Sequence, residues 1–425
     1  MKSLRILGIL LFLTMGISAQ DYVLHCGNLI DTKTGKIKTE MSVVIEGNKI
    51  TQVASGYIEL NPKITTIDLK DKTVMPGLID LHVHLEMEMN PKRYIERFTL
   101  NEADLAYNSV HFAKTTLMAG FTTVRDVGGS GVNVSLRNAV NQGKIIGPRI
   151  FTAEKALAST GGHADPTNGA SRELMGNPGP KEGVVNGVED AKKAVRQRYK
   201  NGADMIKITA TGGVLSMAKN GQNPQFTLEE IEAIVATAKD YGMHVAAHAH
   251  GDEGMRRAVL GGVKTIEHGT LMSEETMDLM IVHDAYLVPT ITAGQSVTEK
   301  AKIDGYFPEI IVPKALSIGP KIQDTFAMAY KKGVGIAFGT DSGVFDHGDN
   351  GKEFALMVEA GMPAIETIQS ATITNAALLN MSDMIGTIES GMLADIIAVD
   401  DNPVKNISTM ENVVFVMKEG VIYKN

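Results

Sequence analysis

Two histidines, His82 and His84, close the apolar run PGLIDLHVH and could supply half of a metal site. If this run is a β-strand, side chains two positions apart point to the same face, so both imidazoles would project together beyond the strand end. A pair of ordinary histidines at a strand terminus is the alternative, and the pair alone does not decide between the two. A metal site requires further ligands elsewhere in the chain.

Further polar residues stand near the ends of later apolar runs. They are Lys207 in ADMIKITATGG, His248 and His250 in HVAAHAHG, His268 in KTIEHGT and Asp341 in VGIAFGTDS. With the first pair they exceed the three protein ligands that a catalytic zinc commonly takes, so two metal ions fit the number better. The alternatives are that His248 and His268 are core histidines and that Asp341 caps a following helix.

Lys207 is an unusual member of such a set, because a lysine ammonium carries the same sign of charge as a metal ion and has no lone pair. It lies between Ile206 and Ile208, where the segment is otherwise apolar. Burial and neighbouring cations would lower its pKa, and a neutral amine can add carbon dioxide to become a carbamate, which could bridge two ions as a carboxylate does. A surface or ion-paired lysine is the alternative.

The segment between Val74 and Ser342 has eight short apolar runs separated by stretches with helical periodicity. The runs are VMPGLIDLHVH, FTTVRDVGG, PRIFTAEKA, ADMIKITATGG, HVAAHAHG, KTIEHGT, AYLVPTITAG and VGIAFGTDS. Strands that alternate with helices predict parallel βα units, and eight units predict a closed (β/α)8 barrel of the α/β class. Active sites of such barrels lie at the C-terminal ends of the strands, where the polar residues stand.

The remaining sequence predicts how the chain is divided. Residues 1–19 have a basic start, an apolar run and small residues before the expected cleavage after Ala19, as a signal peptide does. Residues 20–75 and 385–425 are rich in short β-type runs and turns, and we expect them to form one composite β-sandwich beside a barrel of residues 76–384. One barrel helix should begin with a capping box of Thr227 and Glu230 and end at Gly242.

Composition excludes several classes of protein. The 425 residues are 44% hydrophobic and carry a net charge of −8, which indicates a globular protein without affinity for nucleic acid. No segment after the signal approaches the length of a membrane span, so we expect an exported, periplasmic or extracellular protein without a membrane anchor. The sole cysteine, Cys26, cannot form an intrachain disulfide.

The ordered set of paired histidines in the first run, a lysine in the fourth, histidines in the fifth and sixth and an aspartate in the eighth resembles the amidohydrolase superfamily of metal-dependent hydrolases. The resemblance covers essentially the whole mature chain, including a β-domain built from both ends. It implies two divalent metal ions, which we expect to be zinc, although manganese, cobalt and iron suit such ligands too. It implies these ligands: His82, His84 and Asp341 on one ion, His248 and His268 on the other, and carboxylated Lys207 between them.

The same resemblance implies a mechanism. A hydroxide that bridges the metals would be the nucleophile, since coordination lowers the pKa of water. Asp341 would take its proton as a base and later deliver it to the leaving nitrogen as an acid.

Five stretches narrow the resemblance to exported dipeptidases of the Xaa-Pro or Xaa-Arg type, which are related to imidazolonepropionase. They are TGGHAD at 160–165, KITATGG at 207–213, AAHAHG at 246–251, IEHGT at 266–270 and HGDNGKEF at 347–354. This similarity implies a substrate that is a dipeptide or N-acyl amino acid with a free C-terminal carboxylate. The glycine-rich loops after Thr160 and Thr211 could present backbone N–H groups to that carboxylate.

Three further histidines each have alternative roles. His163 and His250 are implied to polarise the scissile carbonyl or contact the substrate, although His250 could instead orient a ligand or exchange roles with His248. His347 could close over the pocket as part of a loop, or be a solvated loop histidine. Arg125 and Asp126 are expected to pair structurally near the barrel mouth.

Two other functions remain open from the sequence. A cyclic amide, as in imidazolonepropionase, or a lactone could be the substrate, and a relative without catalytic activity could use the barrel as a scaffold. The bridging lysine weighs against a one-metal deaminase, and the complete ligand set weighs against the scaffold. Resemblance to the family also allows a homo-oligomer.

Overall fold

The computed structural model describes residues 21–59, 61 and 64–425. These residues form a mixed α/β fold with three hydrogen-bonded sheets. The signal peptide predicted for residues 1–19 lies outside the described residues. Among the helices of the described part, none has the length and apolar character needed to cross a membrane.

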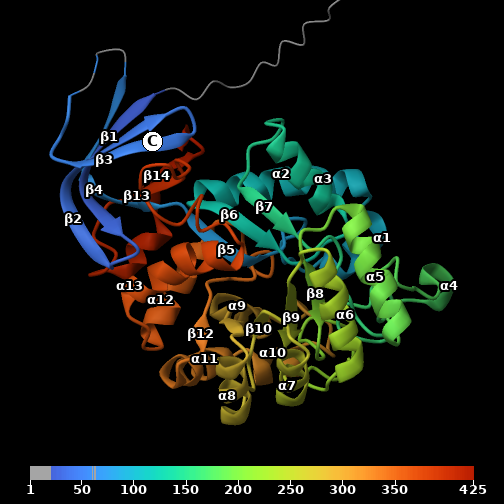
Figure 1. Cartoon of the computed structure of the whole chain (residues 1–425). Helices are drawn as coiled ribbons and strands as arrows, with labels where there is room; N and C mark the ends of the chain where they lie inside the picture. The colour runs from blue at the N-terminus through green and yellow to red at the C-terminus, as the bar shows by residue number, and fades with distance from the viewer. Residues whose placement is uncertain (1–20, 60, 62–63) are drawn as a thin grey trace, which may run out of the picture.

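A seven-stranded sheet joins the two ends of the chain, with the blue N-terminal strands beside the red C-terminal ones in Figure 1. In sheet order its strands are β15 (Val421–Lys424), β14 (Val413–Lys418), β13 (Ile396–Val399), β4 (Thr65–Pro76), β1 (Tyr22–Asp31), β2 (Lys36–Glu46) and β3 (Lys49–Ser55). Strand β13 pairs antiparallel with β4, which places Ala398 opposite Val74. The predicted β-sandwich is therefore one hydrogen-bonded sheet within the described residues, and its β1 and β4 run parallel.

The eight apolar runs between the chain ends each contain a strand of two parallel sheets. One sheet is β5 (Leu78–Val83), β6 (Phe121–Asp126) and β7 (Arg149–Thr152). The other is β8 (Ile206–Thr209), β9 (Val245–Ala249), β10 (Thr265–His268), β11 (Tyr286–Val288) and β12 (Gly335–Ile336). Isolated parallel bridges connect the two sheets, between Leu157 and Ile208 and between Val83 and Ser342.

Helices follow these strands and lie around them, as α5 to α8 show in Figure 1. Their bounds are α1 Arg93–Thr99, α2 Glu102–Met118, α3 Val132–Asn141, α4 Arg172–Met175, α5 Val188–Asn201, α6 Leu228–Asp240, α7 Asp252–Leu260, α8 Glu274–Val282, α9 Ile291–Lys300, α10 Val312–Ile318, α11 Lys321–Lys332, α12 Lys352–Glu359, α13 Ala364–Gln369 and α14 Asn375–Leu378. The capping box at α6 is confirmed, because the Thr227 hydroxyl accepts from the Glu230 N–H and the Glu230 carboxylate accepts from the Thr227 N–H. Gly242 follows the helix with φ of +70°, the left-handed conformation that glycine adopts readily.

A large apolar core holds the parallel strands against their helices. Phe121, Ile208 and Ile266 from the strands are fully buried in it beside Ile231 and Met255 from the helices. Burying each such side chain contributes roughly 1.5–3 kcal/mol, so the strand ends are fixed by many packed residues rather than by loops. A rigid arrangement of this kind can hold polar side chains at the strand ends in one geometry.

Candidate active site

A cavity of about 960 Å³ lies where the carboxyl ends of β5, β8, β9 and β10 meet the loop after β12. This volume is in the range of small-molecule sites. The cavity is lined by most of the residues predicted for the site: His82, His84, His163, Lys207, His248, His250, His268 and Asp341. Residues separated by as much as 259 positions in the chain, from His82 to Asp341, therefore meet in one place.

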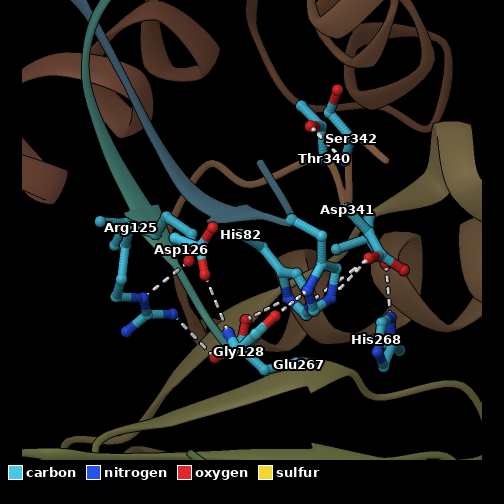
Figure 2. Close-up of polar contacts among 12 residues, drawn as sticks. His82, Arg125, Asp126, Gly128, Glu267, His268, Thr340, Asp341 and Ser342 are labelled. Atoms are coloured by element: carbon cyan, nitrogen blue, oxygen red, sulfur yellow. Dashed lines mark hydrogen bonds and ion pairs between the residues drawn. The ribbon is translucent and has the colours of Figure 1, made fainter. Parts of the chain in front are cut away.

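His82 is held in one orientation by a buried carboxylate. Its Nδ1 lies 2.7 Å from Oε2 of Glu267, so Nδ1 carries the proton and Nε2 keeps its lone pair. The other oxygen of Glu267 accepts from Nη2 of Arg125 at 2.8 Å, and both of these side chains are fully buried. Figure 2 shows the His82 imidazole between Glu267 and Asp341.

His84 presents a second bare nitrogen to the same point. Its Nδ1 lies 2.8 Å from the carbonyl oxygen of Gly128, which can only accept, so Nδ1 again carries the proton. The Nε2 atoms of His82 and His84 lie 3.5 Å and 3.4 Å from Oδ1 of Asp341. That buried oxygen has no hydrogen-bond partner among the described residues. Three lone pairs thus converge where a cation would satisfy all of them.

His268 completes a group that can hold a metal ion. One ligand atom each from His82, His268 and Asp341 lies within 4.8 Å of the others, and all three residues are buried. His268 and Asp341 adopt left-handed backbone conformations, with φ of +72° and +63°. Such conformations cost about 1–3 kcal/mol for residues other than glycine and are found mainly where a side chain must be aimed. The Thr290 hydroxyl fixes His268 further, since it lies 2.7 Å from Nδ1.

His248 and two neighbouring histidines extend the cluster. The ring of His248 lies 4.7 Å from that of His268 and stacks on His163 at 4.3 Å between centroids. Its Nε2 donates to the carbonyl of Gly212 at 3.1 Å, which leaves Nδ1 bare. His250 is bonded through Nδ1 to the Thr270 hydroxyl at 2.8 Å.

His163 and His250 remain neutral in the cavity. Burial lowers the pKa of His163 and of His250 to about 3. Nδ1 of His163 is buried and has no partner among the described residues, and the residue lines the cavity. His250 uses Nδ1 for Thr270 and keeps Nε2 for another partner, so both rings can contact a molecule in the cavity.

Lys207 is buried on β8 and is not surface-exposed or ion-paired. No carboxylate of the described residues lies within 4.0 Å of its ammonium. Burial lowers the pKa of Lys207 to about 8, although the charges of Glu267 and Asp341 oppose the change. Burial thus favours the neutral amine, the form that carbamate formation requires.

Asp341 is not a helix cap. Its N–H donates to the carbonyl of His82 at 2.7 Å, and the next helical turn of the described chain begins only at Asp349. Burial raises the pKa of Asp341 to about 8, while the charge of Lys207 acts in the opposite direction. The charges of Glu267 and Asp80 add to the increase, and the charge of Arg93 opposes it together with that of Lys207.

His347 does not line the cavity, contrary to the substrate-binding role predicted for it. It is buried, its Nε2 donates to the carbonyl of Met87 at 2.9 Å, and its Nδ1 lies 3.0 Å from the Ser342 hydroxyl. Its ring stacks on Phe112. With both nitrogens used, His347 supports the loop after β5 instead of contacting substrate.

Four N–H groups of the glycine-rich loops do not face a substrate carboxylate, contrary to the expectation for these loops. The N–H of Gly161 donates to Asp165, that of Gly162 to Ser159, and that of His163 to Gln225. The N–H of Gly212 likewise donates to Asn223. These donors are already bonded within the protein.

The pairing expected of Arg125 and Asp126 is also different. Arg125 pairs with Glu267, while Asp126 accepts from the backbone N–H of Leu85 and from the Asn133 amide. Glu267 was missed from the sequence as a functional residue. A charged residue inside a buried strand, immediately before a predicted ligand, was the signal that could have indicated it.

One wall of the cavity is apolar. It includes Val214 and Leu215 after β8, Val297 of α9, Ile318 of α10 and Ile322 of α11. Lys314 of α10 supports this wall from behind. Its ammonium donates to the carbonyls of Gly213, Ser216 and Ala218, which follow one another after β8. The cavity thus combines a polar floor with an apolar side that suits an uncharged side chain.

Comparison with known proteins relates this site to a family of hydrolases. The sequence model of the Amidohydrolase family matches residues 73–423. A crystal structure of a Xaa-Pro dipeptidase with methionine bound in its active site is 55% identical, with a TM-score of 0.93, over 96% of this chain and 100% of that one. A prolidase complexed with N-methylphosphonate-L-proline is 34% identical, with a TM-score of 0.87, over 96% and 100% of the two chains. Ochratoxinase from Aspergillus niger is 31% identical over 373 residues, which are 83% of this chain and 75% of that protein.

Proposed function

Because this chain belongs to the amidohydrolase family, we propose that it is a metal-dependent dipeptidase that hydrolyses the amide bond of dipeptides or N-acyl amino acids. The observation that carries the proposal is the convergence of two bare imidazole nitrogens on the unpartnered Oδ1 of Asp341 at the floor of a cavity. The two solved relatives support the substrate class, since methionine and N-methylphosphonate-L-proline both carry a free α-carboxylate.

The donor set fits two divalent metal ions, zinc being our expectation. We assign these ligands: His82, His84 and Asp341 to one ion, His248 and His268 to the second, and Lys207, as a carbamate, to both. The imidazoles are neutral and orient bare nitrogens into the cavity, and burial favours the neutral amine of Lys207, so these ligands are prepared for a cation, whose charge would in turn favour the ionised form of Asp341. Bound metal ions would lower the pKa of water and polarise the amide carbonyl.

The protein's own groups would then guide the proton and the substrate. Asp341 holds an oxygen with no other hydrogen bond at the reacting point, so it can accept the proton of the attacking water and return it to the leaving nitrogen. His163, with a free Nδ1, would bond to the substrate, and His250, fixed by Thr270, would support the ring of His268 against which it stacks. The apolar wall of Val214 and its neighbours excludes water from the reacting bond.

We infer that β5 to β12 form one closed (β/α)8 barrel of residues 76–384, with residues 20–75 and 385–425 as the composite β-domain. Support comes from the parallel pairing of the strands in chain order and from the single bridges at both junctions of the two sheets. In such a barrel the active site lies at the carboxyl ends of the strands, where this cavity lies.

We also propose that the mature protein acts outside the cytoplasm. Support for export is confined to the sequence of residues 1–19, where Lys2 and Arg5 precede an apolar run that ends in small residues. Fractionation of cells that produce the full chain or a chain starting at residue 20 tests this. Recovery of both forms in the cytoplasm would contradict export.

The test of function is amino-acid release from a panel of dipeptides with Pro, Met, Arg, Leu or Asp at the C-terminus, with the matching N-acetyl amino acids. Protein reconstituted with Zn²⁺ and bicarbonate should release the C-terminal amino acid from at least one of them. Lys207→Ala and Asp341→Asn should abolish release while the chain still folds. If protein that carries two metals per chain released no amino acid from any compound of the panel, this would contradict the proposal and favour a cyclic amide or lactone as substrate.

A further inference from the structure

Arg93, the first residue of α1, places a cation on the cavity wall. Its Nη1 contacts the sulfur of Met87, and it forms no ion pair with any carboxylate of the described residues. Other shielded arginines are paired: Arg125 with Glu267, Arg137 with Asp204, Arg149 with Asp395 and Arg198 with Glu154. An unpaired charge in a shielded position is unfavourable unless a partner arrives from outside.

Arg93 lies close enough to the reacting groups for its charge to affect them. Burial lowers the pKa of His84 and of His163, and the charge of Arg93 contributes to both decreases. The same charge opposes the increase in the pKa of Asp341. Arg93 lines the same cavity as His84 and Asp341, so a group bonded to it would lie in the chamber that holds the proposed metal ligands.

The segment that carries Arg93 is fixed in place. The Tyr94 hydroxyl donates to the carbonyl of Leu215 in the loop after β8, at 2.9 Å. The Tyr306 hydroxyl donates to the carbonyl of Met89, at 3.2 Å. One bond ties α1 to Leu215 on the cavity wall and the other ties the preceding loop to Tyr306, so the backbone that carries the guanidinium is held in place for its partner.

Several other candidate anion-binding groups near the cavity are already used. The N–H groups of Gly161, Gly162 and Gly212 are bonded internally, and the Lys314 ammonium donates to three carbonyls. Arg97 donates to the carbonyl of Asn168 and stacks on Phe98 at the surface. Arg93 thus combines shielding, a free charge and proximity to Asp341.

We propose that Arg93 binds the α-carboxylate of the C-terminal residue of the substrate. This inference rests on the proposed dipeptidase function and specifies how the site selects substrates with a free carboxyl terminus. A planar guanidinium can bond both carboxylate oxygens, which fixes the position of the adjacent amide bond. The apolar wall then receives the side chain or the proline ring of that residue.

The test compares Arg93→Met with wild-type protein on one dipeptide and on its C-terminal amide, both loaded with the same metal. We expect kcat/KM of the variant to fall about 100-fold on the acid and to change less than about 3-fold on the amide, because a charged hydrogen bond is lost only with the acid. Lys92→Met is the matched control, since Lys92 is exposed and outside the cavity lining. It should behave as wild-type on both compounds.

Equal loss on the acid and the amide would overturn the proposal by showing a structural role, and so would wild-type activity of Arg93→Met on the acid. Calorimetric titration with L-methionine and L-methioninamide keeps the proposal testable if the wild-type protein cleaves no dipeptide. The wild-type protein should bind the acid more tightly than the amide, and Arg93→Met should lose this preference. Equal binding of both compounds by the wild-type protein would refute the role of Arg93, whereas absent hydrolysis alone would refute only the dipeptidase function.

Discussion

Replacement of Glu267 by Gln should weaken metal binding without removing any proposed ligand. Oε2 of Glu267 lies 2.7 Å from Nδ1 of His82, and Oε1 lies 2.8 Å from Nη2 of Arg125. Both oxygens therefore accept from donors, and an amide NH₂ in either position would face a donor instead. The imidazole would lose its orienting acceptor, and changes of this kind typically cost about 10–100-fold in metal affinity, or about 1.4–2.8 kcal/mol.

The same substitution should lower the stability of the metal-free chain. Arg125 would lose a charged hydrogen bond while fully buried, which costs about 1.5–3 kcal/mol. Chelator competition gives the zinc dissociation constant, and urea unfolding of metal-free protein gives the second quantity. Glu253→Gln is the control, because Glu253 is 43% exposed and its ion pairs with Arg256 and Arg257 contribute about 0–1 kcal/mol. Wild-type zinc affinity in Glu267→Gln would refute the assignment of His82 as an oriented ligand.

Three further changes test other parts of the structure. Burial lowers the pKa of His244 to about 3, so below about pH 6.5 the unfolded chain binds a proton that the folded chain does not, and the wild-type protein loses stability. Between pH 7 and 5 the unfolding free energy of metal-free His244→Gln should therefore fall by about 2 kcal/mol less than that of the wild-type protein. Equal decreases for both proteins in urea unfolding would contradict this. A Cβ at Gly213 would lie 2.2 Å from Cε1 of His163, so Gly213→Ala should displace that ring and lower kcat/KM by about tenfold or more, whereas unchanged kinetics would exclude contact of the ring with substrate. Lys314→Met leaves three carbonyls without their donor, and it should lower the unfolding free energy by about 1–3 kcal/mol; an unchanged urea midpoint would show that water replaces the ammonium.

Much of this site could be predicted from the sequence because its ligands stand at the ends of apolar runs. The alternation of strand side chains places His82 and His84 on one face, and every one of the eight runs contains a strand. Strand ends were less predictable. The run AYLVPTITAG contains only the short strand Tyr286–Val288, because Thr290 turns the chain into α9 with φ of +55°.

Contacts between distant segments could not be predicted in this way. The hydrogen bond between His82 and Glu267 joins residues 185 positions apart in the chain, and no local sequence pattern indicates that these two side chains meet. His347 stands in a polar segment typical of a solvated loop, yet it is buried because Phe112 of α2 covers its ring. The role proposed for Arg93 could not be predicted from the sequence either. It depends on the lack of a carboxylate partner among the described residues, which only the folded structure shows.

Dipeptide hydrolysis by one protein sample, before chelation, after chelation and after return of Zn²⁺ with bicarbonate, tests the central claim most directly. The convergence of His82, His84, His268 and Asp341 on one point predicts that hydrolysis stops when the metal is removed and returns when it is restored. Undiminished hydrolysis by chain shown to be metal-free by elemental analysis would contradict the claim.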